Sequence, residues 1–133
     1  MSNEISRRTV EIRVGGRYKL GKKIGSGSYS EIYEGIDIFQ GVSVAIKLEP
    51  IKSNEIKQLL HEARLLKSIE GEGVPSMYWY GQAGEYDCMV TELLGENLEE
   101  LYEFCNRSFT LKTVIMIAIE AINRIKYLHS CNY

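Results

Sequence analysis

The sequence predicts an α+β fold in which an antiparallel sheet comes first and helices follow. Three observations support this class. Residues 42–49 alternate apolar and polar side chains with the period of two that β-strands show. Residues 56–69 carry apolar side chains at helical spacing. Residues 111–129 form a longer run that is apolar on almost every side, which predicts a buried helix.

The composition indicates one domain of ordinary size. The chain has 133 residues, of which 44% are apolar and 26% charged, as in soluble globular proteins. No run of eighteen apolar residues is present, and the charge clusters are interpreted as solvated faces, so we expect neither a membrane nor a nucleic acid as partner. An odd number of widely spaced cysteines fits no metal pattern and no disulfide framework, which favours an intracellular location, cytoplasmic, nuclear or both: Cys88, Cys105 and Cys131.

Two glycines separated by one residue lie between extended apolar segments. Gly25 and Gly27 follow a predicted strand that starts at Tyr18, and a second strand over 32–36 returns from them. Because glycine has no Cβ, the backbone here can approach a bulky ligand and aim its N–H groups at anions. A turn then leads into the strand over 42–49, so three antiparallel strands are predicted with the glycine loop at one tip.

The alternation over residues 42–49 places Ala45 and Lys47 on one face of the strand, opposite the valines. A small side chain beside a positive charge, under a glycine-rich hairpin, suits a flat base with phosphates attached. This pattern predicts a nucleotide pocket.

A helix is predicted next, from a cap at Asn54 to about Ile69, with Glu55 in its first turn. Glu62 lies at the margin of its apolar stripe, where a carboxylate is partly desolvated and therefore costly unless a cation meets it. Lys47 is the natural candidate for that cation. Taken alone, Glu62 is equally consistent with a solvent-facing position, and it is the preceding glycine loop and lysine strand that favour the pair.

The second half of the chain continues with strands and then helices. Residues 75–81 predict an aromatic-rich strand or strand pair, and residues 86–93 predict a further strand. A break at 94–97 precedes a short acidic helix over 98–104, which predicts a hinge between two structural layers. Thr110 caps the final apolar helix.

Taken together, these residues resemble those of the protein kinases, and more narrowly those of the casein kinase 1 family of serine/threonine kinases. The similarity is collinear and covers nearly all of residues 10–133. The narrower resemblance is carried by five segments, residues 17–20, 23–28, 92–95, 97–101 and 109–114.

The resemblance implies a protein-kinase-like N-lobe, with a five-stranded antiparallel sheet and one helix, followed by a hinge and the first helices of an incomplete C-lobe. A flexible lead-in would span residues 1–13. The N-lobe, with its glycine-rich loop and hinge, would span residues 14–94, and the start of a truncated C-lobe would span residues 95–133.

The resemblance also implies roles for single residues. Lys47 resembles the lysine that holds the α- and β-phosphates of ATP, and Glu62 the helix glutamate that pairs with it, so these two are the catalytic candidates. Thr91 occupies the position at the back of the adenine pocket. The residues expected to bind ATP are Ile24, Gly25, Ser26, Gly27, Ser28, Tyr29, Ser30, Ile32, Ala45, Lys47, Thr91, Glu92 and Leu94.

Two positions depart from the family pattern. Ser30 stands where the third glycine of the loop is usual, and its side chain would tighten or re-aim the backbone there. Thr91 replaces the larger residue expected in this family, which would leave the rear of the pocket roomier.

The sequence ends at Tyr133, where the family continues into its catalytic loop, and it contains neither H-R-D nor D-F-G. We therefore expect no catalytic base, no magnesium ligand or other metal site, and no catalytic competence by these residues alone, with a protein substrate only in a full-length form. Two interpretations stay open: part of a longer kinase, or a naturally shortened, non-catalytic, pseudokinase-like binding module. Self-association or a partner chain would cover the helix over 111–129. A coincidental glycine loop in an unrelated α/β domain is disfavoured by the collinearity.

Overall fold

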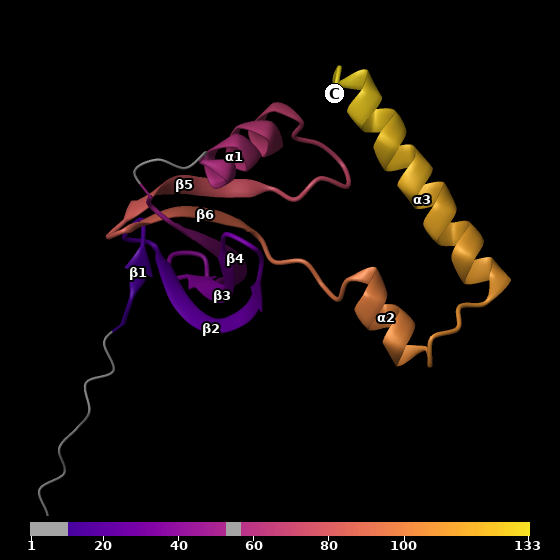
Figure 1. The fold of residues 1–133 in the computed structure, drawn as a ribbon, viewed down its shortest axis with the longest axis horizontal. Helices are drawn as coiled ribbons and strands as arrows, with labels where there is room; N and C mark the ends of the chain where they lie inside the picture. Colours follow the sequence, from indigo (N-terminus) through magenta and orange to yellow (C-terminus); the bar gives the residue numbers. More distant parts are fainter. Residues whose placement is uncertain (1–10, 53–56) are drawn as a thin grey trace, which may run out of the picture.

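The computed structural model describes residues 11–52 and 57–133, and it shows one antiparallel sheet followed by helices (Figure 1). Among these residues the sheet has six strands in the order β1-β2-β3-β4-β6-β5. The strands are β1 (Arg13–Val14), β2 (Tyr18–Ser26), β3 (Glu31–Asp37), β4 (Val42–Pro50), β5 (Met77–Ala83) and β6 (Tyr86–Glu92). The helices are α1 (Gln58–Ser68), α2 (Leu98–Phe104) and α3 (Leu111–Ser130).

The predicted α+β class is confirmed, and the structure adds details that the sequence did not indicate. The edge strand β1 was not among the five expected strands. It pairs Arg13 with Lys19 and Val14 with Tyr18, and two residues are too few to show an alternation. The helix after β4 begins at Gln58. The predicted cap at Asn54 and the first-turn Glu55 lie outside the described residues.

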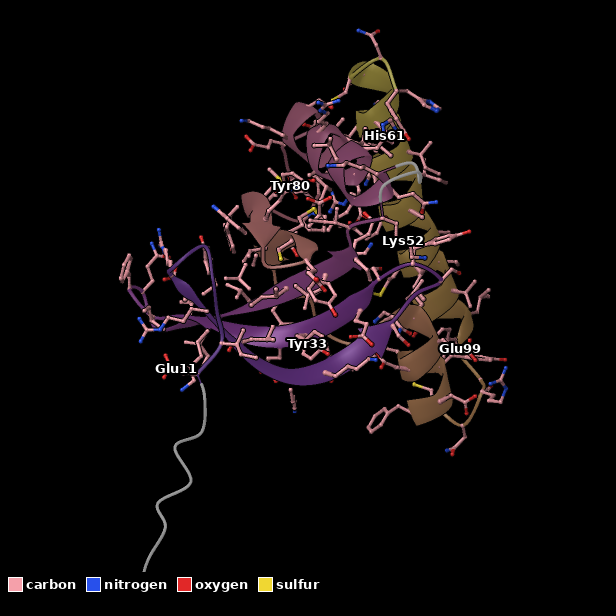
Figure 2. The ribbon with its side chains drawn as sticks, turned by 60° about the vertical axis from the view of Figure 1, so that its left-hand side comes forward. Glu11, Tyr33, Lys52, His61, Tyr80 and Glu99 are labelled. Carbon is pink, nitrogen blue, oxygen red and sulfur yellow. The ribbon has the colours of Figure 1, made fainter. Side chains whose placement is uncertain are left out.

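The two faces of the sheet support two separate cores. One core gathers buried residues of β1, β2, β4 and β6, with Tyr33 packed against it: Val14, Tyr18, Val44, Ile46, Cys88 and Val90. The other lies between the sheet and α1 and contains Leu59, Ala63 and Met89, with Tyr80 packed against it. Figure 2 shows Tyr80 on the side that α1 covers and Tyr33 on the other. Val44 and Ile46 of β4 belong to the first core, so the alternate residues Ala45, Lys47 and Glu49 lie on the face toward α1.

The helices after the sheet begin at capped positions. Asn97 and Glu100 form a capping box at the start of α2, and the Thr110 side chain accepts the Thr113 N–H at the start of α3. None of the residues of α3, all of which the structure describes, is buried, although its apolar pattern is typical of a buried helix. The prediction that self-association or a partner chain covers this helix stays a prediction. In Figure 1 α3 stands apart from the sheet. Exposed apolar side chains of α3 include Ile115, Ile119 and Ile122.

The C-terminal part of α3 contacts the loop that connects α1 to β5. The Tyr127 hydroxyl donates a 2.5 Å hydrogen bond to the carbonyl oxygen of Glu70. A Cβ at Gly71 would collide with the Tyr127 phenol, and one at Gly73 would collide with the Arg124 side chain. This end of the helix therefore packs against two glycines of the loop. Among the described residues no helix is long and apolar enough to cross a membrane.

A buried carboxylate holds the end of the β2–β3 hairpin that lies opposite the glycine loop. Asp37 is 3% exposed, and its carboxylate accepts hydrogen bonds from Arg17 Nε at 2.9 Å and Nη2 at 2.6 Å. It also accepts the backbone N–H groups of Phe39 and Gln40 in the following turn. The Arg17 guanidinium, more than the two turn amides, lowers the pKa of Asp37 from 3.8 to about 2.

We predict that Asp37→Asn lowers the midpoint of urea unfolding at pH 7. The native carboxyl has a depressed pKa, so its contribution to stability is present above about pH 4 and is lost as the pH falls through about 2. The difference between the two proteins should therefore shrink as unfolding is measured from pH 5 down to pH 2.

The matched control is Glu34→Gln, which removes the exposed Lys22–Glu34 pair at 3.5 Å and should change the midpoint little at any pH. A pH-independent deficit in Asp37→Asn would contradict the linkage and would assign the effect to packing.

Candidate functional site

A cavity of about 450 Å³ opens between the sheet and α1, beside the segment that leads to α2. Its wall comes from β2, β3, β4 and β6 on one side and from α1 and residues 94–100 on the other. The lining residues are Ile24, Gly25, Ile32, Ala45, Lys47, Glu62, Leu66, Pro75, Met89, Thr91, Glu92, Leu94, Gly95, Asn97 and Glu100. A volume of several hundred Å³ is typical of small-molecule sites.

The register of the sheet explains why the strand residues meet in this cavity. Residues opposite each other in antiparallel strands project from the same face. Lys47 lies opposite Ile32 of β3 on one side and Met89 of β6 on the other. Ala45 lies opposite Thr91. The face that carries the lysine is therefore also the face that supplies the small and apolar wall.

An ion pair crosses from β4 to α1 in the wall of this cavity. Lys47 Nζ donates to Glu62 Oε2 at 2.6 Å, and the two side chains are 27% and 42% exposed. Glu62 lies next to the buried Ala63 on α1, so the packed stripe of the helix turns the carboxylate toward the sheet. Of the two interpretations of Glu62, the structure has the carboxylate in contact with the amine.

The glycine-rich loop closes on itself between β2 and β3. The Gly27 N–H donates to the carbonyl oxygen of Ser30 at 2.7 Å, and Gly25 lies opposite Ile32 in the ladder. Lys23 Nζ donates to Glu31 at 2.5 Å at the base of the loop. This pair raises the pKa of Lys23 and lowers the pKa of Glu31. The Lys23–Glu31 ion pair thus holds the base of the loop, and the hydrogen bond between Gly27 and Ser30 closes its tip.

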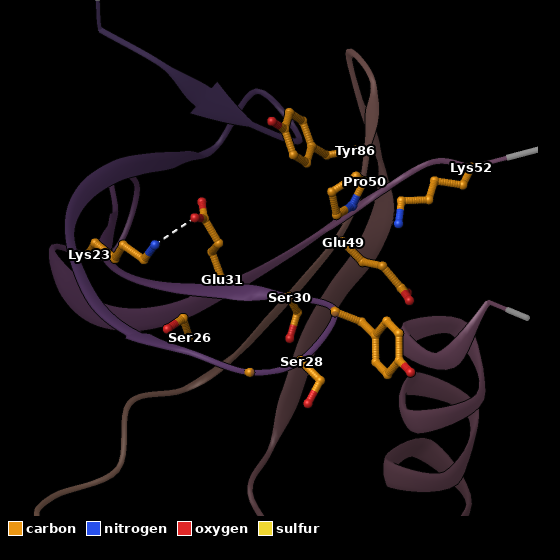
Figure 3. A pocket seen from close by; sticks show the side chains of 11 residues that line it. Lys23, Ser26, Ser28, Ser30, Glu31, Glu49, Pro50, Lys52 and Tyr86 are labelled. Atoms are coloured by element: carbon orange, nitrogen blue, oxygen red, sulfur yellow. Dashed lines mark hydrogen bonds and ion pairs between the residues drawn. The ribbon is translucent and has the colours of Figure 1, made fainter. Parts of the chain in front are cut away.

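The predicted loop residues divide between two cavities. Ile24 and Gly25 line the cavity with Lys47, together with the other predicted residues Ile32, Ala45, Thr91, Glu92 and Leu94. The tip residues instead line a second cavity of about 480 Å³ with β4 and β6, shown in Figure 3: Ser26, Gly27, Ser28, Tyr29 and Ser30.

A small space of about 40 Å³ connects the loop tip to the ion pair, because Tyr29 and Ser30 border it together with Lys47 and Glu62. Ser30 takes part through its backbone, whose carbonyl closes the loop, so the residue in place of a third glycine is accommodated in this turn.

Sequence reasoning missed several residues of the first cavity. Met89 could have been found, because it lies two residues before Thr91 and strand periodicity places both on one face. Leu66 follows Glu62 by four residues on α1 and shares its side of the helix. Asn97 and Glu100 enter the wall as the capping box of α2. Pro75 and Gly95 carried no such signal.

The wall at the end of β6 is fixed by backbone contacts to the start of β5. The Glu92 N–H donates to the carbonyl oxygen of Ser76 at 2.8 Å, and the Thr91 hydroxyl lies 3.3 Å from the Glu92 carbonyl oxygen. Within residues 11–52 and 57–133, no group of three or more histidine, cysteine, aspartate or glutamate side chains is placed to hold a metal ion. The arrangement offers one cation, an apolar slot and a glycine-bearing edge.

Comparison with protein families gives one finding. The family model described as the protein kinase domain matches residues 18–133, which is most of the chain and contains every strand from β2 onward and all three helices.

We predict that Glu62→Gln changes the free energy of unfolding by about 1 kcal/mol or less, because ion pairs in contact with solvent contribute little to stability. Urea unfolding at pH 7 measures the difference. A loss of several kcal/mol would mean that the Lys47–Glu62 pair holds the fold together, which its exposure argues against.

Proposed function

This chain belongs to the protein kinase domain family, and from that membership we propose that it binds ATP in the cavity beside Lys47. Protein kinases transfer the γ-phosphoryl group of ATP to protein hydroxyls, with magnesium bound to the phosphates. The finer proposal is that residues 1–133 are the N-terminal, ATP-binding part of a casein kinase 1-like serine/threonine kinase. The observation that carries it is the Lys47–Glu62 contact at 2.6 Å beneath the glycine-rich strand.

The geometry of the cavity suits a nucleotide. Ala45 and Thr91 are neighbours across β4 and β6, and their small side chains leave a slot for a flat base. Lys47 is the cation available to the phosphates, and Glu62 holds its amine in place. An ammonium–phosphate hydrogen bond is charge-assisted, and these bonds are the strong ones in protein sites. Ile24 and Ile32 supply apolar contacts above the base.

The glycine-rich loop would cover the phosphates. Gly25 already lines the cavity, and the tip residues Tyr29 and Ser30 border the space next to Lys47. The tip also faces the second cavity, so we propose that the loop moves toward Lys47 when ATP binds. Glycines permit such rearrangement at low conformational cost.

The proposed division of the chain follows the structure's change from sheet to helices. Residues 14–94 would form the N-lobe with its hinge, and residues 95–133 would begin the second lobe. The narrower assignment to casein kinase 1 is supported by the sequence segments around the loop, the hinge and the start of α3, residues 23–28, 92–95 and 109–114.

We further propose that residues 1–133 by themselves bind nucleotide weakly and transfer no phosphate. In the kinase template the nucleophile is oriented by an aspartate of H-R-D, and magnesium is held by the aspartate of D-F-G and an asparagine. Incubation of the purified chain with labelled ATP and casein tests this proposal. Labelling of casein or of the chain itself would overturn it.

We predict that Lys47→Met weakens ATP binding by about 10- to 100-fold, because a hydrogen bond to a charged group contributes about 1.5–3 kcal/mol. Calorimetric titration with ATP, with and without magnesium, measures the affinity. The midpoint of unfolding should change little. Sub-micromolar, magnesium-dependent binding by the unaltered chain would contradict the expectation of weak affinity.

The control is Lys22→Met. Lys22 lies on β2 of the same sheet, pairs with Glu34 and does not line the cavity. Its ATP affinity should equal that of the unaltered chain. Equal ATP binding by Lys47→Met and Lys22→Met would mean that the nucleotide binds elsewhere.

A further inference from the structure

The first turn of α1 is attached to the sheet rather than capped by its own residues. Lys57 stands at the N-cap position, and within the described residues its side chain makes no capping hydrogen bond and the first turn contains no acidic residue. The first N–H groups of any helix lack partners inside the helix. Leu59 is 2% exposed, so water has little access to the amide at this position.

Glu49 supplies the missing acceptor from the neighbouring strand. Its Oε2 accepts the Leu59 N–H at 2.8 Å. A carboxylate at a helix N-terminus satisfies an unpaired donor and also interacts favourably with the helix dipole. In Figure 3 the Glu49 side chain extends from its strand toward the first turn of the helix. The cap of α1 therefore belongs to β4.

A second contact holds the same helix end to β6. Asp87 lies opposite Glu49 in the ladder and is 3% exposed. It forms an ion pair with Lys57 at 3.7 Å and accepts a hydrogen bond from Gln82 at 3.1 Å. The longer distance and the exposed lysine make this the weaker of the two attachments. Of the two polar contacts between the sheet and the first turn, the Glu49 hydrogen bond is thus the stronger.

The position of this cap bears on the Lys47–Glu62 pair, which lies one helical turn later. Glu49 follows Lys47 by two residues, so both side chains leave the same face of β4. Leu59 precedes Glu62 by three residues, so the amide that Glu49 holds and the carboxylate that Lys47 holds lie about one turn apart along α1. Two adjacent residues of one strand face thus bind two adjacent turns of one helix.

We propose that Glu49 is a positioning residue. By accepting the Leu59 N–H it sets the position of α1 relative to β4, so that Glu62 meets Lys47. Glu49 does not line the 450 Å³ cavity proposed for ATP, but it borders the 40 Å³ space that Lys47 and Glu62 also border. Its effect on the pair needs no ligand, whereas its effect on ATP affinity rests on the proposed function.

The first experiment reads the position of α1 without nucleotide. Glu49→Ala should speed hydrogen exchange of the Leu59 amide about five- to tenfold, as expected for a lost helix cap. It should also speed acylation of Lys47 by an amine-reactive ester, since the amine loses its partner. Glu49→Gln, which keeps an oxygen acceptor, should stay close to the unaltered chain. Glu85→Ala, a glutamate in the β5–β6 turn, should change neither rate.

A shortened side chain keeps this test decisive where Glu49→Ala does not fold. Glu49→Asp retains the charge but withdraws the carboxylate by one methylene, so it should resemble Glu49→Ala in both rates. Unchanged Leu59 exchange and unchanged Lys47 acylation in Glu49→Asp would overturn the proposal. Equal effects in Glu49→Gln and Glu49→Asp would also overturn it, since the acceptor would then not matter.

The second experiment distinguishes action through the pair from a general loss of structure. Glu49→Ala as a single substitution should weaken ATP binding severalfold. Added to Glu62→Gln, it should cause no further loss of ATP affinity. An equal further loss in that background would overturn the positioning role. Absence of ATP binding by the unaltered chain would overturn the proposed function alone, because the exchange and acylation rates would still decide the role of Glu49.

Discussion

The alternation of side chains along β4 is the constraint on which the rest of this structure depends. β4 is hydrogen-bonded on both edges, to β3 and to β6, so its register cannot shift without reversing every side chain that it carries. One face supplies Val44 and Ile46 to a core, and the other presents Ala45, Lys47 and Glu49 to the cavity and to α1. One face of β4 thus packs in the core and the other carries the residues of the cavity. Burial of the first face fixes the position of the second.

The contacts between α1 and the sheet are of two kinds, apolar burial and partly exposed ion pairs. The first stabilises the fold, and the second orients side chains. Leu59 and Ala63 are buried against Met89, and this apolar contact holds the helix on the sheet. Both side chains of the Lys47–Glu62 pair and the lysine of the Lys57–Asp87 pair are in contact with solvent, so these pairs orient side chains more than they stabilise the fold. The Arg17–Asp37 pair is the contrasting case. There the guanidinium donates two hydrogen bonds to the carboxylate, two backbone amides share it, and its pKa is lowered to about 2.

Strand periodicity predicted the strand with Lys47 and the face that Ala45 shares with it, because a period of two is local and survives in any register. The cost of a desolvated carboxylate left two positions open for Glu62, and the preceding glycine loop and lysine strand favoured its pairing with Lys47. Other features could not be read this way. β1 has two residues and therefore no pattern, and the cap of α1 comes from Glu49, ten residues before the amide that it accepts. The division of the loop residues between two cavities depends on how the turn at Gly27 and Ser30 closes, which no spacing in the sequence specifies.

The contact between the end of α3 and the loop after α1 has a consequence for sequence variation. At Gly71 the phenol of Tyr127 occupies the space that a methyl group would need, and at Gly73 the guanidinium arm of Arg124 does the same, at a backbone angle of +81° that already favours glycine. Segments more than fifty residues apart therefore share one volume. A larger residue at Gly71 therefore requires the Tyr127 phenol to move or to be replaced by a smaller side chain, so substitutions at these two positions should be inherited together, whereas the backbone angle at Gly73 disfavours any side chain whatever stands at 124.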